Sequence, residues 1–221
     1  SNTPRRGLPV VKWPAMARSL QALDPRHDAY GAMLRAVVGG RHADEIMERD
    51  DGLIYRGDPS DYFSPFGRWP AVERKAMRFV RGRVLDAGCA AGRGRLYLQS
   101  RGFEVVAVDE SPAAVEIARA RGVHDARVAS LLDLNLGATP FDTVLLVRNN
   151  FGLAGTPAKA RAWLRKLARQ TSARGRLITD SVDPARIDPD DMPAYAGAGH
   201  PAWGHSWRVR VRFKTFATPW F

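Results

Sequence analysis

Two acidic residues follow two apolar runs in the middle of the sequence, and the first of them opens a glycine-rich turn. Asp86 follows Val84 and Leu85 and begins the segment Asp-Ala-Gly-Cys-Ala-Ala-Gly, whereas Asp109 ends the apolar run 105–108. The carboxyl ends of neighbouring parallel strands lie at one edge of a sheet, so both acids and the turn should meet there. A carboxylate can accept the two hydroxyls of a ribose. The pattern therefore predicts a nucleoside pocket.

The position of Asp86 bears on which nucleoside is held. The pyrophosphate of a dinucleotide needs bare backbone N–H groups at a helix N-terminus, and a carboxylate beside it is repulsive. S-adenosylmethionine has no phosphate and carries an ammonium and a sulfonium, which an acid attracts. Asp86 directly before the turn therefore favours the methyl donor.

These residues carry a resemblance to a known family. The segment 86–92 resembles the glycine motif of class I S-adenosylmethionine-dependent methyltransferases, and Asp109 matches the ribose-binding acid of that fold. The elements expected from residue 84 to 181 are similar in order to the family core. The segments 44–52, 149–153 and 219–221 look like a bacterial subgroup of small methyltransferases, actinobacterial in type, whose substrates are mostly unassigned.

The resemblance implies S-adenosyl-L-methionine as cofactor, S-adenosyl-L-homocysteine as product and a set of cofactor-binding positions. They are Asp86, Ala87, Gly88, Ala90, Gly92, Asp109, Glu110, Ser130, Leu131, Val147 and Arg148. Two of them depart from the family pattern. Ala90 replaces the usual middle glycine, and Ser130 stands where the family has an acid that reads the adenine amino group, with Asp133 close enough to substitute.

The acceptor side is less defined by the sequence. Methyl transfer from a sulfonium is an in-line displacement that needs positioning, and a base where the acceptor must lose a proton. Asn149 and Asn150 follow an apolar run, and His205 lies in a segment rich in Pro, Ala and Gly, so these three are candidates for orienting or deprotonating an acceptor. Tyr62 and Trp69 belong to an aromatic group expected to cover the cofactor or substrate. No His, Cys, Asp or Glu grouping has metal-ligand spacing, so no metal is expected.

Two other functions compete with a small-molecule methyltransferase. A short-chain NAD(P)-dependent oxidoreductase would fit the glycine spacing 88–94, but none of the five tyrosines is followed by a lysine four residues later, as that chemistry requires. An RNA-binding or RNA-modifying protein would fit two basic elements. These are the segment 159–169, with five Lys or Arg and no acid, and the segment 208–214, where Arg208, Arg210, Arg212 and Lys214 alternate with apolar residues.

The chain as a whole has the composition of a globular protein. It has 221 residues, a formal net charge of +11 and one cysteine, which is typical of a reducing compartment, so a cytoplasmic location is expected. No apolar run is long enough to cross a bilayer, so no membrane partner is expected. A small molecule is the expected partner. The charge does not exclude nucleic acid.

Strand and helix patterns alternate through the second half of the sequence. Strands are predicted at 83–87, 104–108, 126–130, 142–147 and 175–181, with helices at 93–101, 112–121 and 157–170 between them. This alternation predicts an α/β fold, a doubly wound, Rossmann-like and mostly parallel sheet with helices on both faces. Residues 81–221 are expected to form this core, and residues 1–80 an N-terminal lid of helices and loops.

Expectations for the two ends of the chain are less regular. Helices are predicted at 28–38 and 70–80, residues 42–49 could add a further helical turn or two, and 51–69 reads as a covering loop. The family core continues after residue 181 with a helix and a reversed pair of strands, but only one strand, 206–214, is evident. The C-terminal edge of the sheet is therefore expected to be incomplete.

Overall fold

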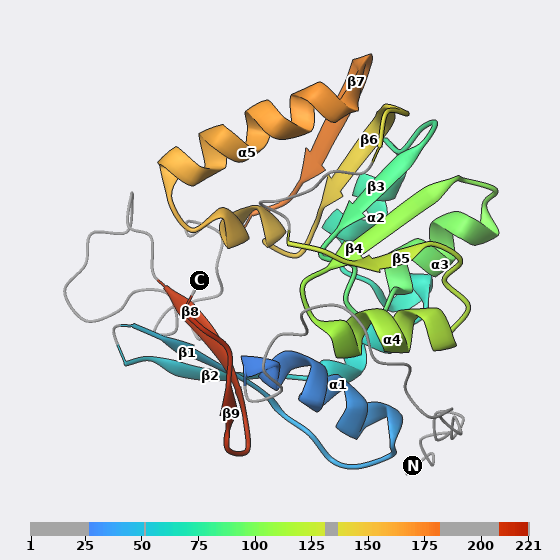
Figure 1. Ribbon diagram of the computed structural model, residues 1–221. Helices are drawn as coiled ribbons and strands as arrows, with labels where there is room; N and C mark the ends of the chain where they lie inside the picture. The colour runs from blue at the N-terminus through green and yellow to red at the C-terminus, as the bar shows by residue number, and fades with distance from the viewer. Residues whose placement is uncertain (1–26, 51, 131–136, 182–207, 221) are drawn as a thin grey trace.

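A five-stranded parallel sheet forms the centre of the computed structural model, which describes residues 27–50, 52–130, 137–181 and 208–220. The strand order is β5-β4-β3-β6-β7, so β3 lies in the middle, where the direction of strand progression reverses (Figure 1). The strands are β3 (Val84–Ala87), β4 (Val105–Asp109), β5 (Ala126–Val128), β6 (Phe141–Leu146) and β7 (Thr171–Thr179). The predicted doubly wound fold is confirmed, and β7 is the edge of this sheet.

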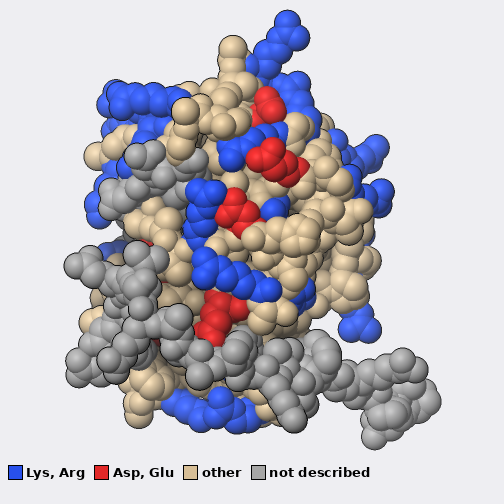
Figure 2. All heavy atoms as spheres, turned by 45° about the vertical axis from the view of Figure 1, so that its right-hand side comes forward, with Lys and Arg blue, Asp and Glu red and all other residues tan. Residues whose placement is uncertain are grey.

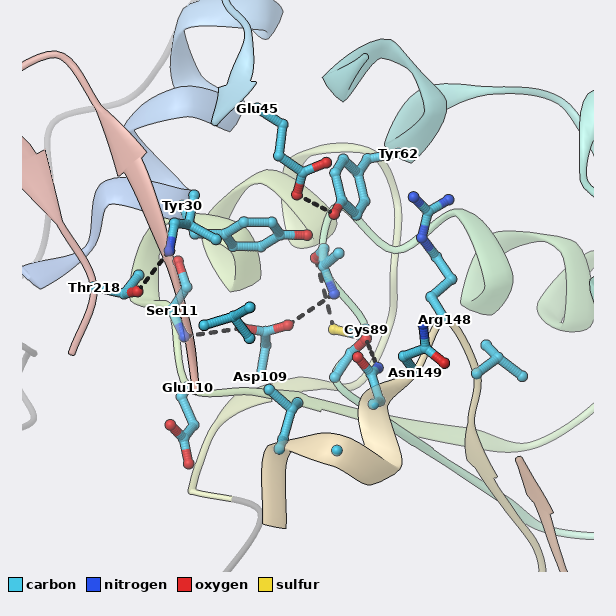
Figure 3. A pocket seen from close by; sticks show the side chains of 18 of the residues that line it. Tyr30, Glu45, Tyr62, Cys89, Asp109, Glu110, Ser111, Arg148, Asn149 and Thr218 are labelled. Atoms are coloured by element: carbon cyan, nitrogen blue, oxygen red, sulfur yellow. Dashed lines mark hydrogen bonds between the residues drawn. The ribbon is translucent and has the colours of Figure 1, made fainter. Parts of the chain in front are cut away.

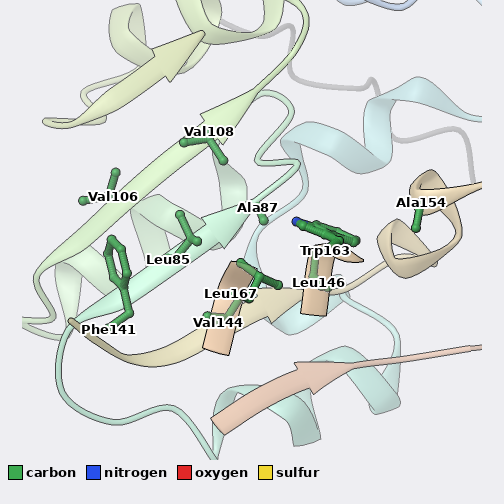
Figure 4. Packing of buried hydrophobic residues seen from close by; sticks show 10 residues of the cluster. All are labelled: Leu85, Ala87, Val106, Val108, Phe141, Val144, Leu146, Ala154, Trp163 and Leu167. Carbon is green, nitrogen blue, oxygen red and sulfur yellow. The ribbon is translucent and has the colours of Figure 1, made fainter. Parts of the chain in front are cut away.

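Helices cover both faces of the sheet. The helix α5 (Pro157–Gln170) packs on one face, where Trp163 and Leu167 lie over side chains of β3 and β6 (Figure 4). The helices α2 (Ala71–Met77), α3 (Arg93–Ser100) and α4 (Pro112–Ala120) contribute to the clusters on the other face. Burying the fully enclosed Phe141 and Trp163 stabilises the fold by roughly 2–3 kcal/mol for each side chain.

Two helices begin at the capping residues that the sequence shows. The side chain of Ser111 accepts a hydrogen bond from the Ala114 N–H at the start of α4, and Thr156 does the same for Lys159 at the start of α5. A proline occupies the first turn of both helices, where its missing N–H costs nothing. Each cap contributes about 1 kcal/mol.

A second, antiparallel sheet lies beside the parallel one and joins the two halves of the chain. Its strand order is β2-β1-β8-β9, with β1 (Glu45–Arg49), β2 (Ile54–Gly57), β8 (Val209–Phe213) and β9 (Phe216–Ala217). The helix α1 (Ala29–Val38) packs against α4 and β8. Residues on both sides of position 80, the domain boundary expected from the sequence, thus pair in one sheet (Figure 1).

The structure corrects several local expectations. Residues 42–49 are not helical, because Glu45–Arg49 form β1, and the expected loop 51–69 contains β2 and two short 3₁₀ helices, η2 (Pro59–Phe63) and η3 (Phe66–Arg68). The predicted strand at 206–214 exists as β8, but it pairs with β1 and not with the parallel sheet. Within the described ranges, no helix is long and apolar enough to span a membrane.

Candidate functional site

A cavity of about 610 Å³ opens at the carboxyl ends of β3, β4 and β6. This is the place where ligands bind in open α/β sheets, because the strand order reverses there. Nearly all the residues that the sequence singles out around the glycine turn face it (Figure 3). Those that line it are Asp86, Gly88, Ala90, Asp109, Glu110, Val147, Arg148, Asn149, Asn150, Tyr62 and Trp69.

Three expected positions lie outside the lining. Ala87 and Ser130 are not on the cavity wall, and Gly92 faces α4, where an added Cβ would lie 2.7 Å from a methyl group of Val123. The close approach that this glycine permits is therefore helix packing. Leu131 and His205 fall outside the described residues.

Asp109 lies at the end of β4 and holds the glycine turn in place. Its carboxylate accepts hydrogen bonds from the backbone N–H groups of Ala90, at 2.8 Å, and Ser111, at 2.9 Å. Burial raises the pKa of Asp109 to about 6, although these two hydrogen bonds lower it. The carboxylate thus connects β4 to the turn after β3.

Asp86 is the most deeply buried acid of the predicted set. Its side chain is 5% exposed, and burial raises its pKa to about 7, with Asp109 adding to the rise while Arg95 and Arg93 oppose it. Two carboxylates with raised pKa values in one cavity mean that their charges are incompletely compensated by the protein. A ligand with positive charge is favoured there.

Residues with a strained, left-handed backbone conformation are concentrated around this cavity. Four non-glycine residues of the described chain have a positive φ, and three of them line the cavity: Ala90 at 50°, Arg148 at 63° and Asn149 at 59°. Such conformations cost about 1–2 kcal/mol for each residue and concentrate at functional sites. The alanine that replaces the family's middle glycine thus takes a glycine-like conformation, and its N–H contacts Asp109.

The amide of Asn150 braces the glycine turn. Its Nδ2 donates to the carbonyl oxygens of Ala87 and Gly88, each at 3.0 Å. A Cβ on Gly88 would lie 2.3 Å from this nitrogen, and Gly88 has a φ of +81°. The sequence suggested that one of the two asparagines orients an acceptor, but the described contacts of Asn150 show that it positions the turn.

The opposite wall of the cavity contains an acid that the sequence analysis missed. Glu45 of β1 is 8% exposed and accepts a hydrogen bond from the Tyr62 hydroxyl at 2.6 Å. The rings of Tyr62 and Tyr30 meet edge to face, with centroids 5.3 Å apart. Glu45 lies within residues 42–49, which read as polar and helical, so its only sequence signal is the resemblance of the segment 44–52 to methyltransferases.

A buried ion-pair network supports the aromatic side of the cavity. Glu73 of α2 is 4% exposed and forms ion pairs with Arg93 and, at 3.8 Å, with Arg148. The Arg93 guanidinium lies over the Trp69 ring, and that of Arg148 lies over Tyr62, 4.6 Å from the ring centre. Trp69 is 3% exposed, so it acts mainly as packing, whereas Tyr62 faces the ligand space.

Comparison with known proteins places this cavity in a familiar context. Residues 84–175 match the family model described as a methyltransferase domain. A crystal structure of a S-adenosylmethionine-dependent methyltransferase from Bacteroides fragilis, in complex with S-adenosyl-L-homocysteine, superposes with a TM-score of 0.76. It is 26% identical in sequence, and the match covers 91% of this chain and 81% of that chain.

Two curated relatives share part of the sequence. The cypemycin N-terminal methyltransferase from Streptomyces sp is 34% identical over 47% of this chain and 43% of its own length. The tRNA (uracil(54)-C(5))-methyltransferase of Pyrococcus horikoshii is 33% identical over 49% of this chain and 28% of its own length. The chain thus spans less than half the length of these two relatives, and neither is an oxidoreductase.

The family match begins with β3 and contains the glycine turn and Asp109, and the fold agreement covers 91% of the chain. Fold, domain match and cavity position therefore lead to one family. Residues 84–175 carry a methyltransferase domain, and the chain shares the fold of an S-adenosylmethionine-dependent methyltransferase.

Proposed function

We propose that the chain binds S-adenosylmethionine in the cavity at the carboxyl ends of β3 and β4 and transfers its methyl group to a small-molecule acceptor. The observation that carries this proposal is the pair of carboxylates, Asp86 and Asp109, on the wall of one cavity. When bound, the cofactor supplies an electrophilic methyl group on a positively charged sulfur.

The residues present fit such a ligand better than a nicotinamide dinucleotide. A cationic ligand lowers the raised pKa values of Asp86 and Asp109, because it favours their charged forms. A pyrophosphate would raise them further. In this proposal Asp109 would accept hydrogen bonds from the ribose hydroxyls, Gly88 would let the backbone approach the ligand, and the bend at Val147 and Arg148 would border the methionine portion.

The cavity also supports a small acceptor. Its volume of about 610 Å³ lies within the range of small-molecule sites, roughly 300–1,000 Å³. Three residues from outside the parallel sheet also line it: Tyr30 of α1, Glu45 of β1 and Val211 of β8. The two curated relatives are named for different acceptors, the N-terminus of cypemycin and a uracil of tRNA, so their names do not decide the class. The enclosure by α1, β1 and β8 favours the small molecule.

In the proposed reaction the protein acts chiefly by positioning. Asn150 and Asp109 hold the glycine turn from two sides, and Tyr62 and Tyr30, which line the same cavity, would exclude water from it. Holding two reactants in line in a dry site removes much of the entropic barrier to displacement.

Calorimetric titration with S-adenosylmethionine and S-adenosylhomocysteine, with NADPH as the control ligand, tests this proposal. We expect both sulfur compounds to bind and NADPH not to bind. Replacing Asp109 by Ala removes the proposed ribose acceptor and should weaken both ligands by about tenfold or more, which is about 1.4 kcal/mol.

The matched control is Asp125→Ala. Asp125 pairs with Arg127 before β5 and does not line the cavity, so this variant should bind as the parent does. Equal affinity of the Asp109→Ala variant and the parent, or tighter binding of NADPH than of either sulfur compound, would contradict the proposal.

A further inference from the structure

The charge of the cavity is opposite to that of the molecule. The chain carries a net charge of +11, yet six acidic side chains and three arginines line the cavity. On the face shown in Figure 2, Lys and Arg lie around the periphery and also among the Asp and Glu side chains near the middle. Two of the acids, Asp86 and Asp109, belong to the proposed cofactor side, so the remaining negative charge needs another explanation.

Glu45 is the acid on the acceptor side. Its carboxylate is buried on the cavity wall, and within the described ranges the Tyr62 hydroxyl is its hydrogen-bond donor and no Lys or Arg forms an ion pair with it. Two charged groups act on its pKa in opposite directions: Arg148, which also forms an ion pair with Glu73 at 3.8 Å, lowers it, and Asp61 raises it. A buried carboxylate without an ion-pair partner is costly, and a cationic ligand would offset that cost.

Aromatic and apolar surfaces surround this carboxylate. Tyr30 and Tyr62 cross edge to face beside it, as Figure 3 shows. Met47, Val209 and Val211, from the neighbouring strands β1 and β8, line the same cavity. Aromatic faces attract cations, and the apolar side chains suit a hydrocarbon body attached to the charged group.

We infer that the acceptor is an amine with an apolar body, whose ammonium group binds to Glu45 between Tyr30 and Tyr62. This inference rests on the proposed function and names its substrate class. An acidic acceptor, such as a carboxylate or a phenolate, would place a second negative charge against Glu45. The Arg148 guanidinium would offset part of it, although that group also pairs with Glu73 and lies over the Tyr62 ring.

The same carboxylate can prepare the amine for transfer. An ammonium nitrogen has no free electron pair, so one N–H bond must break first, and its proton passes to a Glu45 oxygen. The neutral nitrogen then forms a bond to the methyl carbon, while the carbon–sulfur bond breaks and its electron pair stays on sulfur. The product is a methylated ammonium and a neutral thioether, and the proton on Glu45 leaves to solvent.

Binding of three probes with the same phenylethyl body tests the inference. Phenethylamine, 2-phenylethanol and 3-phenylpropanoate share a phenyl ring on a two-carbon chain and differ in the charge of the end group. Each is titrated calorimetrically into the full chain saturated with S-adenosylhomocysteine. We expect the amine to bind about tenfold more tightly than the alcohol, and the carboxylate to bind most weakly.

Variants assign the preference to Glu45. Glu45→Gln keeps the shape and an acceptor for the Tyr62 hydroxyl but removes the charge, and should abolish the preference for the amine. Glu104→Gln makes the same change at an exposed site outside the cavity and should keep it. Tyr62→Phe keeps the ring and the charge of Glu45, so it should also retain the preference for the amine over the carboxylate.

Failure of the two proposals can be told apart. Absence of S-adenosylhomocysteine binding in the parent chain contradicts the proposed function itself. Normal S-adenosylhomocysteine binding without a preference for the amine, or a preference that survives Glu45→Gln, overturns this inference alone. Loss of S-adenosylhomocysteine affinity in Glu45→Gln with an unchanged amine preference also overturns it, because Glu45 would then hold the cofactor.

Discussion

Asp86 makes the stability of the free protein depend on pH. Burial raises the pKa of Asp86 to about 7 and that of Asp109 to about 6, whereas both are near 4 in an unfolded chain. Between about pH 4 and 7 the folded chain therefore binds more protons than the unfolded chain. The contribution of these groups to the free energy of unfolding is fully present below that window and is lost as the pH rises through it.

The variant Asp86→Asn isolates this effect. At about pH 8 it should be more stable than the parent by a few kcal/mol, since each unit of pKa shift is worth about 1.4 kcal/mol, and at about pH 4 the two should be nearly equal. Urea unfolding at both pH values measures the difference. A constant difference at all pH values would show that packing, and not ionisation, distinguishes the two chains.

Gly88 and Gly102 offer a matched pair of glycines with nearly the same backbone conformation. Their φ angles are +81° and +83°, but a Cβ on Gly88 would collide with Asn150, whereas nothing lies within 4 Å of a Cβ on Gly102. We expect Gly102→Ala to cost about 1 kcal/mol of stability and to leave ligand binding unchanged. Gly88→Ala should cost more and should abolish S-adenosylhomocysteine binding in calorimetry.

A double variant identifies the source of that extra cost. Combining Gly88→Ala with Asn150→Ala removes the collision together with the two hydrogen bonds from the amide. If the brace is the cause, the two changes are not additive, and the double variant loses less stability than the sum of the single variants. Simple additivity would mean that the backbone conformation alone makes this position require glycine.

At the scale of elements, β8 separates two kinds of side chain. Phe213 points inward and packs against α1, whereas Arg212 points outward and forms an ion pair with Glu48. Phe213→Ala should cost about 3–5 kcal/mol and should weaken S-adenosylhomocysteine binding, because β8 also carries Val209 and Val211 of the cavity wall. Arg212→Ala should cost less than about 1 kcal/mol.

Thermal unfolding and calorimetry of these two variants measure both effects. Equal destabilisation by Phe213→Ala and Arg212→Ala would show that the antiparallel sheet is held by its charges and not by its packing on α1. Unchanged ligand affinity in a folded Phe213→Ala variant would show that β8 and its packing on α1 contribute nothing to ligand binding.

The sequence predicts the parallel sheet well because its information is local. Each of β3, β4 and β6 is a short apolar run that ends at a turn or an acid, and α4 and α5 begin at visible caps. The same local pattern placed Asp86, Gly88 and Asp109 at one edge. The antiparallel sheet was missed because Glu45–Arg49 has no apolar alternation, and its pairing with β8 depends on residues 160 or more positions away.

At the scale of the whole molecule, the basic charge divides into paired and unpaired parts. Alternation along β8 does place its arginines on one face, as the sequence predicts, but Arg208 pairs with Asp50, and Arg210 and Arg212 pair with Glu48. This strand therefore offers little free charge to a nucleic acid. The helix α5 instead exposes several basic side chains on its outer face.

Binding to RNA should accordingly be weak and unspecific. We expect retention on immobilised unfractionated tRNA at about 0.05 M salt, lost at about 0.2 M salt, as is typical of contacts to phosphates alone. Saturation with S-adenosylhomocysteine should not change it. Retention that persists at the higher salt and responds to the ligand would favour an RNA substrate over a small molecule.

The pairing of β1 with β8 also sets an order of events during synthesis. The ribosome releases the chain from its N-terminus, so β3 to β7 emerge while the partner of β1 is still being made. Loop closure over such a separation is slow. A nascent chain can therefore hold the glycine turn and both aspartates at the sheet edge while β8, which completes the cavity wall, is still missing. The cavity closes only after residue 213 has been released, so the ability to enclose an acceptor arises after the glycine turn and both aspartates are in place.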